Sequence, residues 1–336
     1  MRPTTPKRWC VAMVAALVTC TAMVFGVAGP ANAEPDDEGG TASLREQLDA
    51  AARGYLDATA KLENSQKKQK ALAQQVVLVE VELVAQNAAV AQLAAAAYRS
   101  GPLASTSALF ASEDPAMLMD RLALLGAISA HDAAKVEELK TTRAELAEAK
   151  AAIDIEIAEQ RKQRDEMAKK KRAAEKALAS VGGGQTTGFG GSGSASATPA
   201  PRNADGSWPA ETCRLDDPTT SGCITPRTLH ALQQAKAAGY TRYVSCYRSS
   251  GSGEHPKGRA CDFAAAVGGF GGTAYGGDKT YGTNLANYFK ANASRLGVLY
   301  VIWYRQIWMA STGWRAYSGS GSPSADHTNH VHLSVY

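Results

Sequence analysis

The sequence predicts a long α-helical coiled-coil hairpin followed by a small α+β domain with a mainly antiparallel sheet. Two observations lead to this prediction. Residues 43–98 repeat apolar side chains at alternating spacings of three and four, which is the heptad pattern of a coiled coil. Residues 205–336 instead contain short apolar runs separated by glycine-rich turns, which indicates several strands and few helices.

The first predicted helix covers residues 43–98 and has one apolar seam. At 1.5 Å per residue it would be about 80 Å long. Gly101-Pro102 is expected to end it. Polar residues interrupt the seam only at Ser65, Gln69 and Gln86. The seam residues are Leu44, Leu48, Ala51, Tyr55, Ala58, Leu62, Leu72, Val76, Val79, Leu83, Val90, Leu93 and Ala97.

A second helical segment is expected to run to about Val181 and to complete a coiled-coil hairpin over residues 41–181. Its apolar positions are Leu118, Leu122, Leu125, Val136, Leu139, Leu146, Ile153 and Ile157. The irregular stretch between the helices carries Leu109, Phe110 and Met117. Apolar residues at such a tip either cap the hairpin's own core or form a docking surface for a partner, and the sequence leaves both open.

Residues 1–33 have the pattern of a secretory signal peptide. Arg2, Lys7 and Arg8 precede an apolar stretch, and Ala31-Asn32-Ala33 forms a cleavage site. The alternative is an uncleaved membrane anchor, because the apolar stretch is nearly long enough to span a bilayer. We expect a secreted or cell-wall-associated protein with no transmembrane segment after cleavage.

The charge balance gives no indication of a nucleic-acid partner. The whole sequence has 36 Lys and Arg, and three of them lie in the signal peptide. The chain after residue 33 therefore has 33 basic and 32 acidic residues, a net charge of +1. No basic patch interleaved with aromatic residues occurs in the sequence.

The cysteines of the chain after residue 33 all lie in the C-terminal domain. An even number of cysteines in an exported domain predicts disulfides. Three pairings are possible, of which we favour a local Cys213–Cys223 loop and a Cys246–Cys261 bridge. A cysteine-rich zinc ribbon is not expected, because the sequence has no Cys-x-x-Cys pair.

Residues 182–204 are mostly Gly, Ser, Thr, Ala and Pro, with one aromatic residue, Phe189, and are expected to form a flexible linker. In the domain that follows, a glycine-rich loop is expected over 268–282. We expect a helix at 284–296 and a central strand at 298–303.

Histidines cluster at the end of the sequence, in Asp326-His327-Thr328-Asn329-His330-Val331-His332. In a strand His330 and His332 would lie on the same face. His255 and Asp262 occur together upstream. Imidazole and carboxylate are ligands that zinc accepts, so we expect a zinc site, although histidines at a terminus can also bind metal adventitiously.

The pattern His255-x-x-Gly258-x-Ala260-x-Asp262, followed by His330-x-His332, resembles the zinc signature of the lysostaphin / D-Ala-D-Ala carboxypeptidase / hedgehog superfamily, including VanY- and MepA-type peptidoglycan peptidases. The resemblance implies that His255, Asp262 and His332 bind zinc. It also implies that His330 and His327 assist catalysis and that Arg248 orients the substrate.

Two positions depart from that family pattern. Asn329 stands where VanY-type enzymes place the glutamate that acts as general base, and an amide cannot take a proton from water at neutral pH. Gly253 stands where the family has a serine. The base must therefore be another group, or the domain is inactive.

The hairpin resembles the coiled-coil regions of EnvC- and PcsB-type regulators of cell-wall hydrolases, which implies an FtsX-type membrane permease as a partner at the tip. Together the two resemblances imply a zinc-dependent peptidase acting on peptidoglycan peptide. The alternative is a non-catalytic zinc-bearing module that binds the wall, or a coiled-coil activator of other hydrolases.

Overall fold

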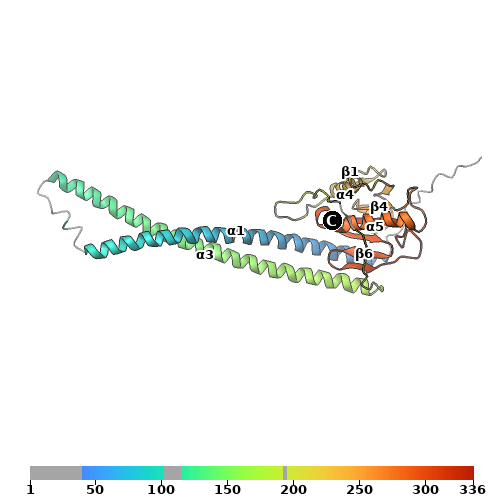
Figure 1. Cartoon of the computed structure of the whole chain (residues 1–336), viewed down its shortest axis with the longest axis horizontal. Helices are drawn as coiled ribbons and strands as arrows, with labels where there is room; N and C mark the ends of the chain where they lie inside the picture. Colours follow the sequence, from blue (N-terminus) through green and yellow to red (C-terminus); the bar gives the residue numbers. More distant parts are fainter. Residues whose placement is uncertain (1–39, 102–106, 108–114, 192–194) are drawn as a thin grey trace, which may run out of the picture.

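The computed structural model describes residues 40–101, 107, 115–191 and 195–336. The expected signal peptide and the tip residues Leu109 and Phe110 lie outside these ranges. A long helical hairpin extends from one side of a small α+β domain (Figure 1). This is the fold class that the sequence predicts.

The hairpin consists of α1 (Ala42–Ser100) and α3 (Pro115–Ala179). The side chain of Thr41 caps α1 by accepting a hydrogen bond of 3.1 Å from the backbone N–H of Leu44. Gly101, with φ of 74°, ends the helix at the expected place. The helices lie side by side near the domain and separate toward the tip (Figure 1).

The polar interruptions of the heptad seam form hydrogen bonds between the two helices. Ser65 donates to the carbonyl of Glu156 at 3.0 Å, and Gln69 accepts from Gln160 at 2.8 Å. Gln86 donates to Glu138 at 3.3 Å. Buried polar pairs of this kind fix the register of a coiled coil, because any shift would leave the groups unpaired.

By length and composition alone, α1 is apolar enough to cross a membrane. This differs from the expectation that no segment after residue 33 would be apolar enough to span a membrane. Part of its apolar content forms the seam with α3, in which Leu48, Ala58 and Val79 are buried.

The domain is built on a six-stranded antiparallel sheet with strand order β3-β4-β8-β5-β6-β7. Its strands are β3 (Val244–Ser245), β4 (Ala260–Ala264), β5 (Val298–Trp303), β6 (Gln306–Met309), β7 (Gly313–Ala316) and β8 (His330–Val335). A separate pair, β1 (Leu215–Asp216) and β2 (Cys223–Ile224), lies beside it. The disulfides Cys213–Cys223 and Cys246–Cys261 are both formed.

The two faces of the sheet have different partners. One face packs against α4 (Pro226–Ala237), α5 (Gly276–Ala291) and α6 (Ala293–Leu296). The other face packs against the base of the hairpin, where Leu48 of α1 and Leu178 of α3 form one buried apolar cluster with Ile302 of β5. Side chains of a strand alternate between faces, so Val331 and Leu333 of β8 enter the first core, and the histidines on either side of Val331 face the hairpin.

Helix α5 begins eight residues earlier than expected, at Gly276 instead of Asn284. The glycine-rich composition suggested a loop, but Asp278 lies in the first turn, where a carboxylate stabilises the helix N-terminus. The helix packs Leu285 and Phe289 into the core. Tertiary packing therefore overrides the poor helix propensity of these glycines.

In the segment expected to be a flexible linker, residues 182–191 and 195–204 lie along the surface of the domain, which differs from a free tether. The N–H of Thr186 donates to the carbonyl of Trp314 at 3.2 Å, and Phe189 packs edge-on against the Trp314 ring at 5.1 Å. Ala197 and Ala200 donate their N–H groups to Asn292 and Arg295. Composition predicted mobility, but Phe189 provides an apolar anchor and the backbone finds acceptors on the domain.

We expect Phe189→Ala to lower the free energy of unfolding by about 1–3 kcal/mol, because it removes a partly buried aromatic contact. The variant should also be cleaved faster by protease within 182–204, measured by mass spectrometry of the fragments. Thr187→Ala, an exposed neighbour, serves as the control. Rapid cleavage of the unmodified chain in this segment would show that it is free in solution.

Candidate metal centre

Three donor residues reach the site from adjacent elements. Asp262 lies on β4 and His332 on β8, and the two are direct partners across the strands. His255 begins the short 3-10 helix η1 (His255–Lys257), which Gly258 ends with φ of 66°. A Cβ at Gly258 would lie 2.5 Å from the sulfur of Cys213, so only glycine fits this turn.

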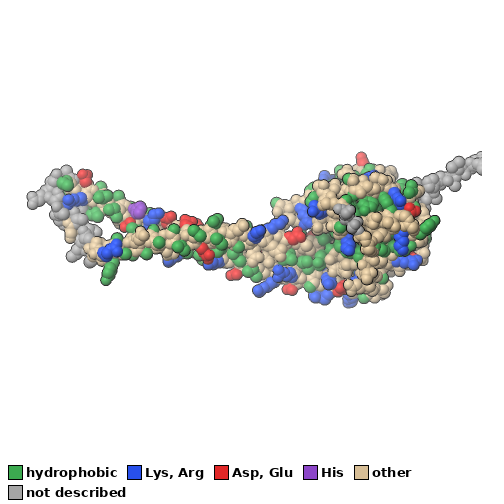
Figure 2. Space-filling view, viewed as in Figure 1, with side chains coloured by type: hydrophobic (Ala, Val, Ile, Leu, Met, Phe, Trp, Pro, Cys, Tyr) green, Lys and Arg blue, Asp and Glu red, His purple; other side chains and the backbone are tan. Residues whose placement is uncertain are grey.

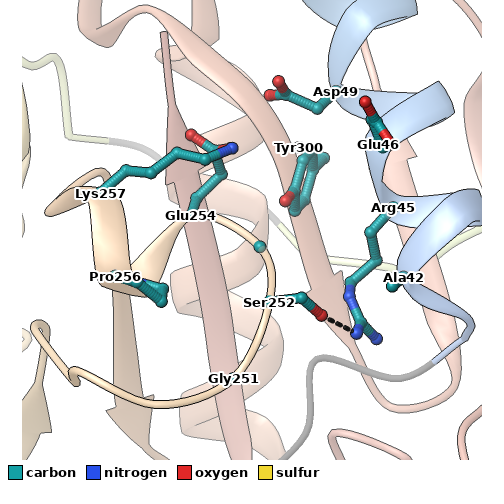
Figure 3. Close-up of a pocket in the computed structure, with 11 residues that line it drawn as sticks. Ala42, Arg45, Glu46, Asp49, Gly251, Ser252, Glu254, Pro256, Lys257 and Tyr300 are labelled. Carbon is teal, nitrogen blue, oxygen red and sulfur yellow. Dashed lines mark hydrogen bonds and ion pairs between the residues drawn. The ribbon is translucent and has the colours of Figure 1, made fainter.

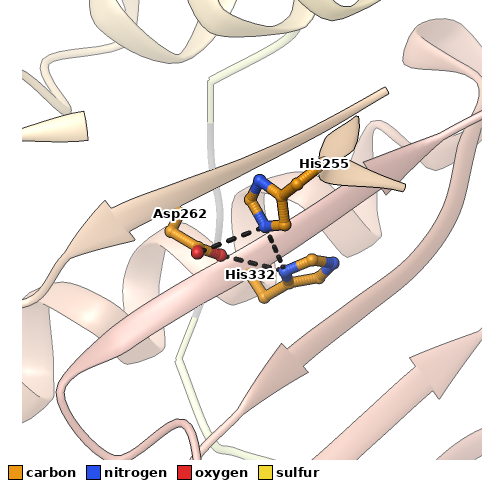
Figure 4. A group of neighbouring side chains, drawn as sticks. All are labelled: His255, Asp262 and His332. Carbon is orange, nitrogen blue, oxygen red and sulfur yellow. Dashed lines mark hydrogen bonds and ion pairs between the residues drawn. The ribbon is translucent and has the colours of Figure 1, made fainter. Parts of the chain in front are cut away.

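The donor atoms of the three residues lie close together, and Figure 4 shows the two rings and the carboxylate facing one another. His255 Nε2 lies 3.2 Å from His332 Nδ1 and 3.2 Å from Asp262 Oδ2. His332 Nδ1 lies 2.9 Å from Asp262 Oδ1. Ligands at about 2.1 Å from a tetrahedral ion are about 3.4 Å apart. The three residues, all buried, could therefore hold a metal ion.

Neighbouring groups orient both histidine donors. The carbonyl of Cys246 accepts a hydrogen bond from His255 Nδ1, which leaves Nε2 unprotonated and free to bind a metal. His332 Nε2 lies 2.8 Å from Ser334 Oγ, so its Nδ1 is the nitrogen that faces Asp262. Tyr300 stacks on the His332 ring at 5.7 Å with an interplanar angle of 10°. The rings are held in the orientation that metal binding needs.

His330 lies beside the donor group without belonging to it. His330 Nε2 lies 3.5 Å from Asp262 Oδ1 but is not one of the set whose donor atoms all lie within 4.8 Å of one another. Among the described residues, that set contains His255, Asp262 and His332. Structural zinc sites are usually closed by four protein ligands, whereas catalytic sites usually have three. The group has three donors among the described residues.

His327 and His330 face each other beside the donors, with ring centroids 4.7 Å apart. His327 has a positive φ of 51°, which costs energy for a residue with a side chain. Its backbone is held by the turn at Tyr304 and Arg305, whose N–H groups donate to the carbonyls of His327 at 2.8 Å and Asp326 at 3.0 Å. His327 Nε2 is buried and has no hydrogen-bond partner among the described residues.

Asn329 fixes the orientation of His330. Its amide nitrogen donates to the carbonyl of Gly271 at 2.8 Å, so its oxygen faces His330 Nδ1 at 2.7 Å. An amide oxygen only accepts, and His330 Nδ1 must therefore carry the proton. Nε2 of the neutral ring is left unprotonated and directed at Asp262. Asn329, at the position where VanY-type enzymes have a glutamate, therefore fixes the tautomer of His330.

Arg248 also reaches the centre, with its guanidinium 3.3 Å from Asp262 Oδ2. The disulfide next to it joins Cys246 to Cys261, which directly precedes Asp262. The bridge therefore ties the segment that carries the arginine to the strand that carries the carboxylate. All six residues expected to form the site are brought together by the fold, and each is at most 9% exposed in its side chain.

Burial and neighbouring charge determine the protonation of the centre. Burial alone would raise the pKa of Asp262, but the neighbouring imidazoles of His255, His330 and His332 hold it well below its usual value. Burial lowers the pKa of His330 to about 4 despite the opposing charge of Asp262. Burial, with the charges of His330 and His332, lowers the pKa of His327 well below its ordinary value.

The base of the hairpin borders the centre. Glu254, directly before His255, is buried and forms ion pairs with Arg53 of α1 at 2.7 Å and Lys257 at 2.7 Å. Arg45 of α1 donates to Ser252 of the same loop. Between α1 and residues 251–257 lies a cavity of about 360 Å³ with Tyr300 in its wall (Figure 3). None of the three donor side chains lines it.

Three residues that support the centre, Ser334, Tyr300 and Arg53, were not identified from the sequence. Ser334 was detectable, because it lies two residues after His332 on the same strand face. Tyr300 and Arg53 gave no local signal, because they come from strands and helices distant in the sequence.

The fold and site together define a small antiparallel α+β domain with a His-Asp-His group that could hold a metal ion. Residues 220–328 match the family described as VldE, C-terminal domain. The match includes His255 and Asp262 and ends before His332. No curated protein and no solved structure matches the chain. None of the matches supports the resemblance to D-Ala-D-Ala carboxypeptidases or to EnvC.

We expect the chain without residues 1–33 to bind about one zinc ion, by the donor set described. His332→Ala and Asp262→Ala should each weaken binding by at least about 10²-fold, because each removes a ligand and not merely a supporting contact. His330→Ala should keep the metal. Elemental analysis after dialysis measures all three, with His131→Ala on the hairpin as the control.

The outcome that would contradict this assignment is equal metal content in the His332, Asp262 and His330 variants.

A second expectation concerns the stability of the metal-free chain. Because the pKa of His330 is lowered to about 4, the unfolded chain binds more protons than the folded chain between about pH 6.5 and 4. Stability should therefore decrease as pH falls through this range. Thermal unfolding followed by circular dichroism should show a smaller decrease for His330→Gln than for the unmodified chain. Equal decreases would show that His330 is not buried in its neutral form.

Proposed function

We propose that the C-terminal domain is a zinc-dependent peptidase that hydrolyses an amide bond in the stem or cross-bridge peptide of peptidoglycan. The observation that supports this most is the three-donor group with an unprotonated imidazole nitrogen beside it. A metal site with only a structural role would need no such neighbour.

His255 Nε2, Asp262 and His332 Nδ1 would hold the metal ion, and their unprotonated nitrogens and ionised carboxylate suit it. When bound, the ion would supply Lewis acidity toward the scissile carbonyl and lower the pKa of a water. The remaining steps depend on side chains of this chain.

His330 is the group that we propose as general base. It is neutral at physiological pH because burial lowers its pKa to about 4, and Asn329 directs its unprotonated Nε2 into the centre. It would take the proton of the attacking water and return it to the leaving amine. A group with so low a pKa is a weak base, so its effect depends on position.

His327 and Arg248 would stabilise charge on the substrate. His327 has a buried, unpartnered Nε2 held in place by the strained turn described above. Arg248 presents a planar guanidinium that suits the carbonyl or carboxylate of a peptide. We propose His327 as an oxyanion stabiliser or second base and Arg248 as the substrate-orienting residue.

The two disulfides suggest an extracytoplasmic location, where peptidoglycan lies. Export by the signal peptide of residues 1–33 fits this location. An FtsX-type permease at the hairpin tip is the partner that we propose from the hairpin's resemblance to EnvC- and PcsB-type proteins.

Two observations favour a second candidate, a non-catalytic metal-bearing module that binds the wall or activates other hydrolases. Asn329 replaces the expected glutamate and is committed to fixing His330. The donor side chains are also at most 1% exposed, so a substrate needs a movement of the surrounding residues to reach them.

Digestion of purified sacculi by the chain without residues 1–33, with released peptides identified by mass spectrometry, tests the proposal. We expect zinc-dependent release of peptides. His330→Ala should reduce turnover by about 10²-fold with the metal still bound, the usual effect of removing a positioned acid or base. Asn329→Ala should reduce it by about 10-fold, because the tautomer of His330 is then no longer fixed.

His230→Ala, away from the centre, is the control for these variants. If the unmodified chain releases no peptide at any pH from 5 to 8 and Asn329→Glu gains cleavage, the non-catalytic module is the better description.

A further inference from the structure

Helix α1 carries a second apolar seam on the side that faces away from α3. The seam residues repeat at spacings of four and three over three heptads and are Val77, Val81, Val84, Ala88, Ala91, Ala95 and Tyr98. All of them are exposed, Val81 by 67% and Val84 by 70%. Figure 2 shows exposed apolar side chains along the hairpin arm. A sustained heptad pattern on an exposed face indicates a surface that packs against another helix.

This outer seam is also free of charge. Residues 71–98 contain two charged side chains, Glu80 and Glu82. Glu80 forms an ion pair with Lys150 of α3 at 2.9 Å, and Glu82 accepts from Gln86, which bonds to α3. Both carboxylates therefore have their partners on the side of α1 that faces α3. A charged protein surface would find nothing to pair with on the outer side.

A membrane surface fits the outer seam poorly. Helices that lie on membranes carry Lys and Arg beside the apolar face, where they contact lipid headgroups. Residues 71–98 contain neither, and the nearest basic residues are Lys70 and Arg99 at the two ends.

The distribution of side-chain size makes the seam complementary to itself. Large residues, Val77, Val81 and Val84, occupy one half, and small residues, Ala88, Ala91 and Ala95, occupy most of the other. If two copies pair antiparallel about Ala88, Val84 of one lies opposite Ala91 of the other and Val81 lies opposite Ala95. Large side chains then meet small ones at both of these positions, Ala88 meets Ala88 at the axis, and Val77 meets Tyr98 at each end. The small residues near the axis let the two helices approach closely.

We propose that two copies of this chain form an antiparallel dimer through the outer seam of α1, with a twofold axis near Ala88. Such an interface uses the same patch on both copies, as most homodimers do. The two C-terminal domains lie at opposite ends, because Ala42 is 46 residues from Ala88, or about 70 Å along each helix. The pairing is therefore free of collision between domains.

Sedimentation equilibrium of the chain without residues 1–33 should show a monomer–dimer equilibrium. Val81→Glu places a charge in the apolar interface and should raise the dissociation constant by at least about 10-fold. Ile155→Glu is the matched control, because Ile155 is equally exposed, at 68%, but lies on α3 away from the seam. Circular dichroism should show the same helix content for both variants.

Cysteine cross-linking tests the orientation of the pair. The four cysteines of the described domain form two disulfides, and Cys10 and Cys20 are removed with residues 1–33, so one introduced cysteine would be the free thiol. Ala88→Cys should form a covalent dimer under mild oxidation, and Val77→Cys should not. Efficient cross-linking at Val77 would overturn the antiparallel arrangement, because the two Val77 positions of an antiparallel pair lie about 33 Å apart, whereas in a parallel pair they are adjacent.

A monomer at all concentrations, or a dimer unaffected by Val81→Glu, would overturn the proposal. A monomer that floats with phosphatidylcholine vesicles, and loses this with Val81→Glu, would show that the seam binds lipid and not a second copy.

Discussion

The carboxylate of Asp262 is the group on which the C-terminal domain depends. It is almost fully buried, and three imidazoles and one guanidinium lie within 3.5 Å of its oxygens. A buried charge is tolerated only when it is paired, so this carboxylate determines where its neighbours must lie. The disulfide at Cys261 and the pairing of β4 with β8 hold it in place.

The sequence predicted the features that repeat locally. The heptad spacing of residues 43–98 predicted the helix, and the alternation in β8 placed His330 and His332 on one face. The His255 and Asp262 pair was joined to them by ligand chemistry and by the family resemblance, because nothing local shows that β4 and β8 are neighbours. Ligand chemistry then explained why these residue types meet.

Features that depend on contacts between distant residues were not predictable. The segment 182–204 has a linker composition, yet Phe189 packs on Trp314. Asn329 was read as the loss of a base, whereas its amide is held by Gly271 and fixes His330. In both cases local sequence gives the chemistry of a residue but not the partner that the fold supplies.

The ion pair between Arg53 and Glu254 means that the hairpin and the C-terminal domain are not independent modules. Glu254 directly precedes a metal donor, and one of its counter-charges comes from a helix about two hundred residues earlier in the chain. Recombination that joined this domain to a different hairpin would remove that charge and uncover the sheet face that carries His332. The unit that evolution can transfer intact is therefore the domain together with the first turns of α1 and the last turns of α3.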